Sequence, residues 1–145
     1  QPDAGNRFEG YKKALQEAGI KVMPKLVKQG DFSSESGYEK TVELIESKVH
    51  FSALFAANDQ TAYGAIKALS DHGYKVPEDV SVIGFDDLPT SKYFTPALTT
   101  LRQPIEEIGE VCAQSILNLL SGERHEARLP PIDLIVREST KSLYR

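Results

Sequence analysis

The sequence has one cysteine, one methionine and no tryptophan among its 145 residues. The single cysteine, Cys112, cannot form a disulfide within the chain, and its apolar neighbours at helical spacing predict a buried, unreactive thiol. A reducing compartment fits this use of cysteine, so we expect a cytoplasmic protein. The sequence also lacks an apolar run of the roughly 18 residues that a membrane span needs, and no signal segment opens it. We therefore expect no membrane partner.

A strong charge of one sign is also lacking. The chain has 17 basic and 21 acidic residues, a net charge of −4, and its lysines and arginines are scattered along the sequence. This distribution provides no electrostatic footprint for nucleic acid. Because the chain begins at Gln1 and its one methionine is Met23, we expect it to be a piece of a longer polypeptide.

The motifs of common enzyme and metal sites are missing too. We find no phosphate loop, no glycine-rich dinucleotide fingerprint and no nucleophile elbow. The histidines His50, His72 and His125 have no metal-ligand spacing, and we expect all three to be solvated. Asp86 and Asp87 are adjacent, and neighbouring side chains of an extended chain point to opposite faces, which disfavours a shared proton. We expect a protein that is not an enzyme and uses no metal or cofactor.

What the sequence does contain is a regular alternation of helical and strand patterns. Helices are predicted over Asn6–Ala18, Ser36–Ser47 with a capping box of Ser36 and Glu39, Asn58–Gly73, and Pro104–Leu120 with Pro104 as first residue. Strands are predicted at Lys25–Lys28, Phe51–Ala57, Val80–Phe85, Leu98–Leu101 and Ile132–Val136, the second and third buried on both faces. This alternation is typical of βαβ units, so the predicted fold class is α/β, with a parallel sheet flanked by helices.

Polar side chains follow two of these predicted strands. Asn58 and Asp59 come directly after one strand, and Asp86 and Asp87 come after the next. Ligands bind beyond the carboxyl ends of parallel strands, so both places are candidates for a site. From local sequence alone, helix capping by Asn58 or Asp59 is favoured over ligand binding by about two to one. Asp86 is a candidate acceptor for ligand hydroxyls, the competing interpretation is an ordinary turn or surface carboxylate, and Asp87 competes with Asp86 for either role.

Arg7 and Phe32 are two further candidates. Arg7 is predicted in the first turn of a helix, where a cation opposes the helix dipole, so a role as ligand donor and a role as an ordinary exposed arginine are equally favoured. Phe32 lies in a polar loop, where it either covers an apolar face of a ligand or pins the loop to the core. The second interpretation is favoured for this ring.

Several stretches together resemble the effector-binding core of the lactose/galactose-repressor (LacI/GalR) family of regulators. They are Arg7–Tyr11, Gly30–Phe32, Phe55–Asp59, Val76–Asp87 and Pro96–Pro104, followed by Gly109. The match runs from Arg7 to about Thr140, and its specificity lies in the order and spacing of the pieces. The resemblance implies a periplasmic-binding-protein-like type I fold, in which an effector binds in the cleft between two α/β lobes.

The resemblance also implies how this chain is divided. Residues 1–98 would form the C-terminal lobe, residues 99–122 would cross to an N-terminal lobe that the chain lacks, and residues 123–145 would return as a strand and tail. The effector contacts of the family fall on Arg7, Phe32, Asn58, Asp86 and Gln103, with Ile105 as a further apolar edge.

The implied function is allosteric transcription regulation. A small, sugar-like effector would shift the balance between lobe arrangements, and a homodimer would bind operator DNA through a helix-turn-helix upstream of this chain. The alternative is a solute-binding protein of a sugar transport system, although Ser81–Asp87 and Thr99–Pro104 favour a regulator. We also expect Tyr93 and Phe94, with the helices beginning near Asn6 and Asn58, to lie at a self-association surface. The competing interpretation is that both rings cover the core beneath their own loop.

Overall fold

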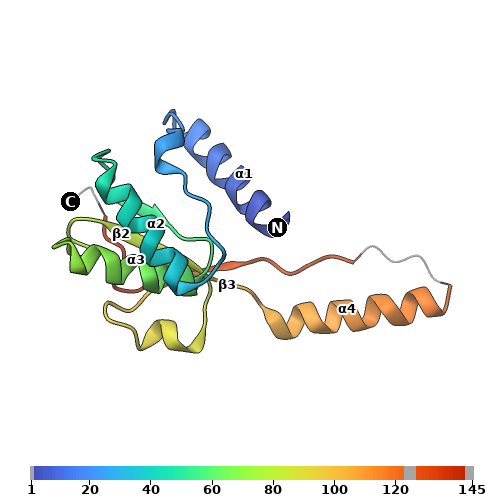
Figure 1. The fold of residues 1–145 in the computed structure, drawn as a ribbon. Helices are drawn as coiled ribbons and strands as arrows, with labels where there is room; N and C mark the ends of the chain where they lie inside the picture. The colour runs from blue at the N-terminus through green and yellow to red at the C-terminus, as the bar shows by residue number, and fades with distance from the viewer. Residues whose placement is uncertain (1, 123–126, 143–145) are drawn as a thin grey trace.

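The computed structural model describes residues 2–122 and 127–142 (Figure 1). Its helices are α1 (Pro2–Glu17), α2 (Ser34–Glu46), α3 (Asp59–Asp71) and α4 (Ile105–Leu120), with short 3-10 turns η1 (Pro24–Leu26) and η2 (Pro89–Lys92). Its strands are β1 (Ala53–Phe55), β2 (Ser81–Asp86), β3 (Thr99–Arg102) and β4 (Asp133–Ile135). Figure 1 shows a body made of α1, α2, α3 and the sheet, from which α4 projects.

The four strands form one sheet in the order β1-β2-β3-β4. β1 and β3 both run parallel to β2, whereas β4 is antiparallel to β3. In the β2–β3 pair, Gly84 lies opposite Thr100 and Asp86 lies opposite Arg102. The predicted α/β class with a parallel sheet flanked by helices is confirmed, with β4 as an added antiparallel strand. The carboxyl ends of β2 and β3 meet at one end of the sheet, here named the carboxyl edge.

Alternate residues of the strands point to two different layers. Val82 belongs to the buried core, together with the fully buried Leu69 of α3. Leu54 packs against this core, as does Ile45 of α2. Phe55 is the next residue along β1, and its ring lies 6.5 Å from that of Tyr11 in α1. Helices α2 and α3 therefore cover one face of the sheet, and α1 contacts the other.

The helix ends show which capping signals the chain uses. Ser33 caps α2 by accepting a hydrogen bond from the Ser36 backbone N–H at 3.0 Å, so the predicted capping box that starts at Ser36 is wrong. The actual N-cap, Ser33, lies three residues before the expected one. Gly19 and Gly73 follow α1 and α3 with φ of +69° and +82°, the left-handed conformation that glycine adopts without strain. They lie at or next to the ends of the helices predicted over Asn6–Ala18 and Asn58–Gly73.

Three predicted elements differ from the structure. The segment Lys25–Lys28 is not a strand, because Pro24 opens the 3-10 turn η1 and the described residues place no strand beside it. The strand predicted over Phe51–Ala57 is only Ala53–Phe55, and as an edge strand it is not buried on both faces, since Phe55 is 36% exposed. Pro104 is the cap residue before α4 and not its first residue.

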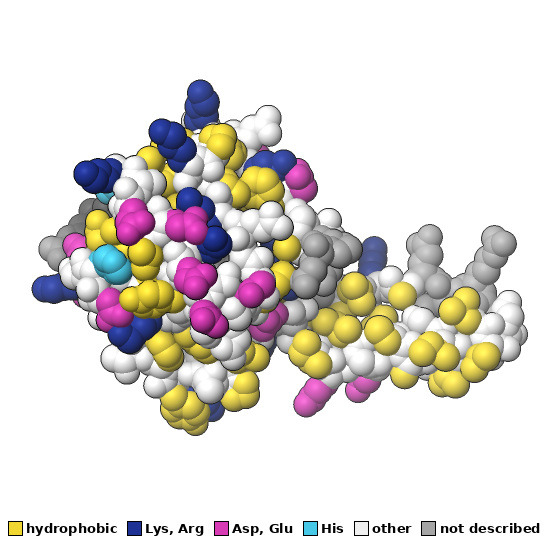
Figure 2. Space-filling view, in the orientation of Figure 1, with side chains coloured by type: hydrophobic (Ala, Val, Ile, Leu, Met, Phe, Trp, Pro, Cys, Tyr) yellow, Lys and Arg dark blue, Asp and Glu magenta, His cyan; other side chains and the backbone are white. Residues whose placement is uncertain are grey.

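Helix α4 buries none of its residues in the described chain. Its exposed apolar residues include Ile105, Ile116, Leu117, Leu119 and Leu120, and Figure 2 shows hydrophobic side chains along the projecting arm. The prediction of a buried Cys112 is wrong in this structure, because that residue lies on α4 and is exposed. Among the described residues, no helix is long and apolar enough to span a membrane.

Two of the three histidines can be compared with the prediction of solvated side chains. His50 and His72 are exposed, as expected. His125 lies outside the described residues.

Candidate functional site

The carboxyl edge gathers side chains from five different parts of the chain. Arg7 comes from α1, Phe32 from the loop before α2, Asn58 from the N-cap of α3, Asp86 from the end of β2 and Gln103 from the residue after β3. All five are half-buried. The structure links them through two sets of contacts, one around Asn58 and Arg7 and one around Asp86.

Asn58 uses both ends of its side-chain amide. Its oxygen accepts a hydrogen bond from the Thr61 backbone N–H at 2.9 Å, and its Nδ2 donates to the Phe32 carbonyl at 3.1 Å. The prediction that Asn58 caps a helix is confirmed. The second hydrogen bond joins the start of α3 to the loop that carries Phe32.

Arg7 lies over aromatic rings at the same edge. Its guanidinium carbon is 4.0 Å from the centre of the Phe85 ring and 5.9 Å from that of Phe32, and Nη1 donates to the Ala57 carbonyl at 2.7 Å. Cation–π attraction and this hydrogen bond together orient the guanidinium. Because α1 begins at Pro2, Arg7 is in the second helical turn and not in the first, so its expected conflict with the helix dipole is weaker.

The Phe32 loop is held by its neighbours. The Asp31 carboxylate accepts hydrogen bonds from the Ser33 hydroxyl at 2.6 Å and the Ser33 backbone N–H at 2.9 Å, and these bonds lower the pKa of Asp31. Phe32 has a φ of +73°, which is uncommon for a bulky residue and indicates that the loop imposes its conformation. The loop is thus pinned by polar contacts, which leaves the ring half-buried beside the Arg7 guanidinium.

Asp86 contacts the residue that follows β3. One of its carboxylate oxygens accepts a hydrogen bond from Gln103 Nε2 at 2.8 Å. Asp86 and Asp87 have φ of +111° and +55°, so two successive non-glycine residues occupy positive φ. Such strain persists only where surrounding contacts enforce it, and it is concentrated at ligand-binding and active sites.

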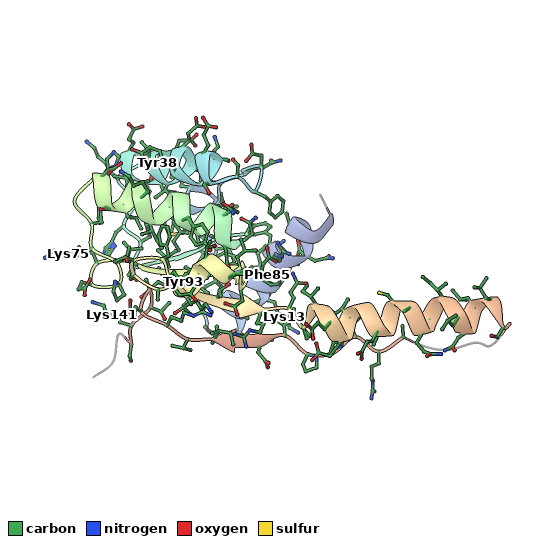
Figure 3. The ribbon with its side chains drawn as sticks, turned by 90° about the horizontal axis from the view of Figure 1, so that it is seen from below. Lys13, Tyr38, Lys75, Phe85, Tyr93 and Lys141 are labelled. Carbon is green, nitrogen blue, oxygen red and sulfur yellow. The ribbon has the colours of Figure 1, made fainter. Side chains whose placement is uncertain are left out.

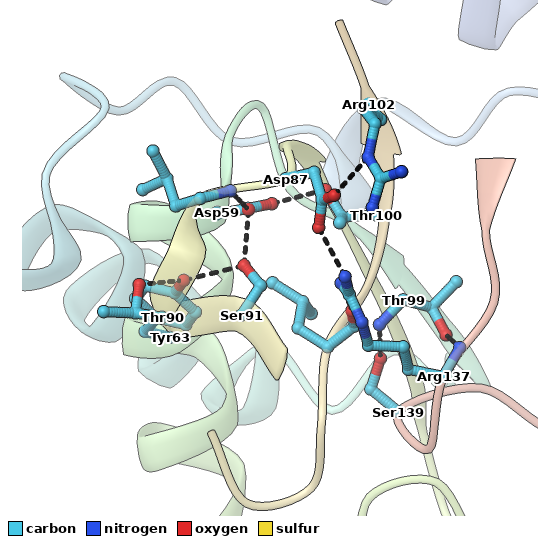
Figure 4. Close-up of polar contacts among 12 residues, drawn as sticks. Asp59, Tyr63, Asp87, Thr90, Ser91, Thr99, Thr100, Arg102, Arg137 and Ser139 are labelled. Carbon is cyan, nitrogen blue, oxygen red and sulfur yellow. Dashed lines mark hydrogen bonds and ion pairs between the residues drawn. The ribbon is translucent and has the colours of Figure 1, made fainter. Parts of the chain in front are cut away.

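Asp87 is committed to two ion pairs. Its carboxylate lies 2.6 Å from Arg102 Nε and 2.7 Å from Arg137 Nη2, and its side chain is 7% exposed (Figure 4). Burial acts to raise the pKa of Asp87, but the hydrogen bonds and charges of the two arginines outweigh it and hold the pKa below its ordinary value. Of the two adjacent aspartates, Asp86 is therefore the one whose position suits a ligand.

Asp59 is the residue whose importance the sequence did not reveal. Its side chain is fully buried, and its carboxylate accepts hydrogen bonds from Leu88 N–H at 2.7 Å, Ser91 Oγ at 2.5 Å and Thr100 Oγ1 at 2.5 Å. From its position after a predicted strand, Asp59 was expected only as an alternative helix cap. Its partners lie 29 to 41 residues away, so no local pattern could have indicated them.

No group of three or more potential metal ligands occurs among the residues described, 2–122 and 127–142. The chemistry available at the carboxyl edge is hydrogen bonding by an amide, a guanidinium and a carboxylate beside an aromatic ring.

Comparison with known proteins agrees with this arrangement. A family model for a periplasmic binding protein-like domain matches residues 1–140. The chain belongs to this family. It is 41% identical over 125 residues to the HTH-type transcriptional repressor PurR of Serratia proteamaculans (strain 568), a match that covers 86% of this chain and 37% of that protein.

Two solved structures share the fold. A sugar-binding transcriptional regulator of the LacI family from Escherichia coli, complexed with phosphate, has a TM-score of 0.86 and 40% identity, covering 92% of this chain and 48% of that one. The lac repressor dimer bound to operator and the anti-inducer ONPF has a TM-score of 0.91 and 31% identity, covering 97% and 49%. The resemblance to LacI/GalR regulators is confirmed, and the chain spans less than half the length of each of these relatives.

The ion pairs of Asp87 predict how stability depends on pH. Because the folded-state pKa of Asp87 lies below its ordinary value of 3.8, the ion pairs contribute fully above that pH, and the contribution is lost as the pH falls through the folded-state pKa. We expect the unfolding free energy of Asp87→Asn to fall less steeply than that of the wild type below about pH 4, as measured by urea titrations of the full-length protein.

Asp133→Asn, which changes an exposed carboxylate on β4, is the matched control and should keep the wild-type slope. An Asp87→Asn protein whose acid slope equals that of the wild type would show that the two arginines do not stabilise the fold through this carboxylate.

Proposed function

We propose that this chain is the effector-sensing part of a DNA-binding transcription regulator. The observation that carries the proposal is the meeting of Arg7, Asn58 and Asp86 at the carboxyl edge, each held by the contacts described above. Sugar hydroxyls both donate and accept hydrogen bonds, so a guanidinium, an amide and a carboxylate can bind several of them. The named relatives, two repressors and one regulator, support this function.

The proposed effector is a small, sugar-like molecule, and each site residue has a distinct role. Arg7 donates to ligand oxygens, Asn58 donates or accepts, and Asp86 accepts from hydroxyls. Phe32, whose aromatic ring is half-buried beside Arg7, covers an apolar face of the sugar ring. Gln103 orients Asp86 through their hydrogen bond, and Ile105, 65% exposed, offers an apolar edge.

The proposed signal runs along the segment that leaves the body after β3. In this proposal the chain up to the end of β3 belongs to one lobe, the segment after Arg102 with α4 crosses to an N-terminal lobe outside this chain, and β4 returns to the sheet. The Gln103–Asp86 hydrogen bond joins the crossing segment to the site. If the crossing segment moves when the lobes rearrange, the contacts between Asp86 and a bound effector change with it. Such a differential contact is what a population shift requires.

A solute-binding protein of a sugar transport system is the alternative with the same fold. The repressor and regulator names of the relatives favour transcription regulation over transport and over an enzyme. We accordingly place the proposed regulator in the cytoplasm, where its operator DNA lies, and assign DNA binding to a helix-turn-helix upstream of this chain.

The effector site can be tested in the full-length protein by calorimetry with D-glucose, D-galactose, D-ribose, cellobiose and inorganic phosphate. We expect one of the sugars to bind, and Asp86→Ala to weaken that binding by about tenfold or more, since it leaves ligand hydroxyls without a charged acceptor. Operator affinity without sugar, measured by gel shift, should stay within about threefold of wild type.

Glu46→Ala, at the exposed end of α2, serves as the control and should bind as the wild type does. Binding of none of the four sugars, or equal affinity in Asp86→Ala, would contradict the proposed site.

The homodimer expected of such a regulator has a candidate surface on α3 and the loop around η2. Tyr93 is 77% exposed, whereas Phe94 is half-buried and stacks on Tyr63 of α3 with ring centres 4.6 Å apart. Figure 3 views the molecule from the side that carries this loop and labels Tyr93. Because α1 lies on the opposite side of the body in Figure 1, we confine the proposed surface to α3 and the η2 loop.

Removing the exposed ring should weaken this dimer. Exposed tyrosines at the centre of interfaces contribute about 2 kcal/mol or more, so we expect Tyr93→Ala to raise the dimer dissociation constant by at least about tenfold. Sedimentation velocity of the full-length protein over a concentration series measures the change. Tyr74→Ala, which removes another partly exposed tyrosine beyond the end of α3, should leave association unchanged; equal association of both variants would argue against the surface.

The exposed apolar face of α4 should be covered in the full-length protein. If the N-terminal lobe packs on it, Leu119→Ala creates a cavity and should cost about 2–5 kcal/mol of unfolding free energy. Gln114→Ala, on the opposite side of the same helix, should change stability by about 0.5 kcal/mol at most. Thermal and urea unfolding distinguish the two cases, and an equally small effect of both variants would place α4 in solvent.

A further inference from the structure

The buried carboxylate of Asp59 lies where four segments of the body meet. Its donors are Leu88 and Ser91, which flank or belong to η2, and Thr100 of β3. Figure 4 shows this group of hydrogen bonds beside the Asp87 ion pairs. No arginine, lysine or histidine forms an ion pair with Asp59 within residues 2–122 and 127–142; the carboxylate is stabilised by these three donors and by the positive end of α3, whose first residue it is.

The fourth segment is β2, which approaches the carboxylate through Gly84. A Cβ atom at Gly84 would lie 2.3 Å from Asp59 Oδ1 and 2.9 Å from Leu98 Cδ2, so only glycine leaves room there. The two strained aspartates, Asp86 and Asp87, lie between Gly84 and Leu88. The Asp59 carboxylate thus lies against Gly84 before this pair and accepts a hydrogen bond from Leu88 N–H after it. These two contacts fix both ends of the short segment that carries Asp86.

Asp59 is also the immediate neighbour of Asn58. The Asn58 side chain is fixed by its cap hydrogen bond to Thr61 N–H, so the first turn of α3 carries both the site amide and the carboxylate that holds the Asp86 segment. We infer that Asp59 is a positioning residue for effector recognition, which fixes Asp86 relative to Asn58 without contacting the effector itself. The inference rests on the proposed function, because it assigns Asp59 to the same site.

The alternative is that Asp59 only stabilises the fold, and a set of variants in the full-length protein separates the two roles. Asp59→Ala removes the acceptor, and Ser91→Ala with Thr100→Val leaves it with one donor. Leu69→Ala, a fully buried residue near the other end of α3, is the matched control because it destabilises the core away from the site. Asp59→Asn is the conservative variant: its oxygen can accept from Leu88 N–H and its amide can donate to a turned Thr100 hydroxyl.

Affinity for the panel sugar that the wild type binds most tightly, among D-glucose, D-galactose, D-ribose and cellobiose, is measured by calorimetry well below each melting temperature. We expect Asp59→Ala and the double variant to raise the dissociation constant by about tenfold or more. Leu69→Ala should leave the dissociation constant unchanged despite a lower melting temperature. Asp59→Asn should keep it within about threefold of the wild-type value. A purely structural role predicts that affinity follows melting temperature in every variant, Leu69→Ala included, and that outcome overturns the inference.

If none of the four sugars binds the wild type, the proposed function fails, and a ligand-free measurement still tests whether Asp59 fixes the segment that carries Asp86. Hydrogen exchange of the segment from Asp86 to Leu88 should be faster in Asp59→Ala than in Leu69→Ala, because only the first variant removes the acceptor of Leu88 N–H. Equal exchange in the two variants overturns the positioning role.

Discussion

The parallel pairing of β2 with β3 is the constraint on which the rest of the site depends. Its register sets Asp86 opposite Arg102, so the last residue of each strand meets the residue that follows the other strand: Asp86 meets Gln103, and Arg102 meets Asp87. A slip of one residue would turn every side chain of β3 to the other face. Both pairs would then be lost together, along with the Thr100 hydroxyl that reaches the interior of the body.

Sequence patterns were sufficient for the parts of the fold that local physics determines. Apolar periodicity located α1, α3 and α4, and the helix-ending glycines and the Asn58 cap were correctly placed. The errors arose where the outcome depends on neighbours. The segment after Pro24 has strand-forming residues, but it is not paired in the sheet of the described chain, and the apolar strand after Phe51 lies at an edge of that sheet.

The site was predictable to a different degree. Local sequence left Arg7 and Asn58 with open roles, and only the family resemblance grouped all five site residues, which the structure then places around one edge of the sheet. The supporting carboxylates escaped prediction, because their partners are distant along the chain: Arg137 lies 50 residues beyond Asp87. An aspartate in a turn has the same local pattern whether it points to solvent or bridges two arginines.

The projecting helix α4 has a consequence for handling the chain on its own. A helix that exposes Ile116, Leu119 and Leu120 on an arm away from the body presents a contiguous apolar stripe to water. Two such arms can bury their stripes against each other, whatever surface the complete protein uses to associate. Self-association of the isolated chain, seen by light scattering or cross-linking, would therefore come from α4. Replacing the apolar residues of the stripe with charged ones would keep the isolated chain monomeric.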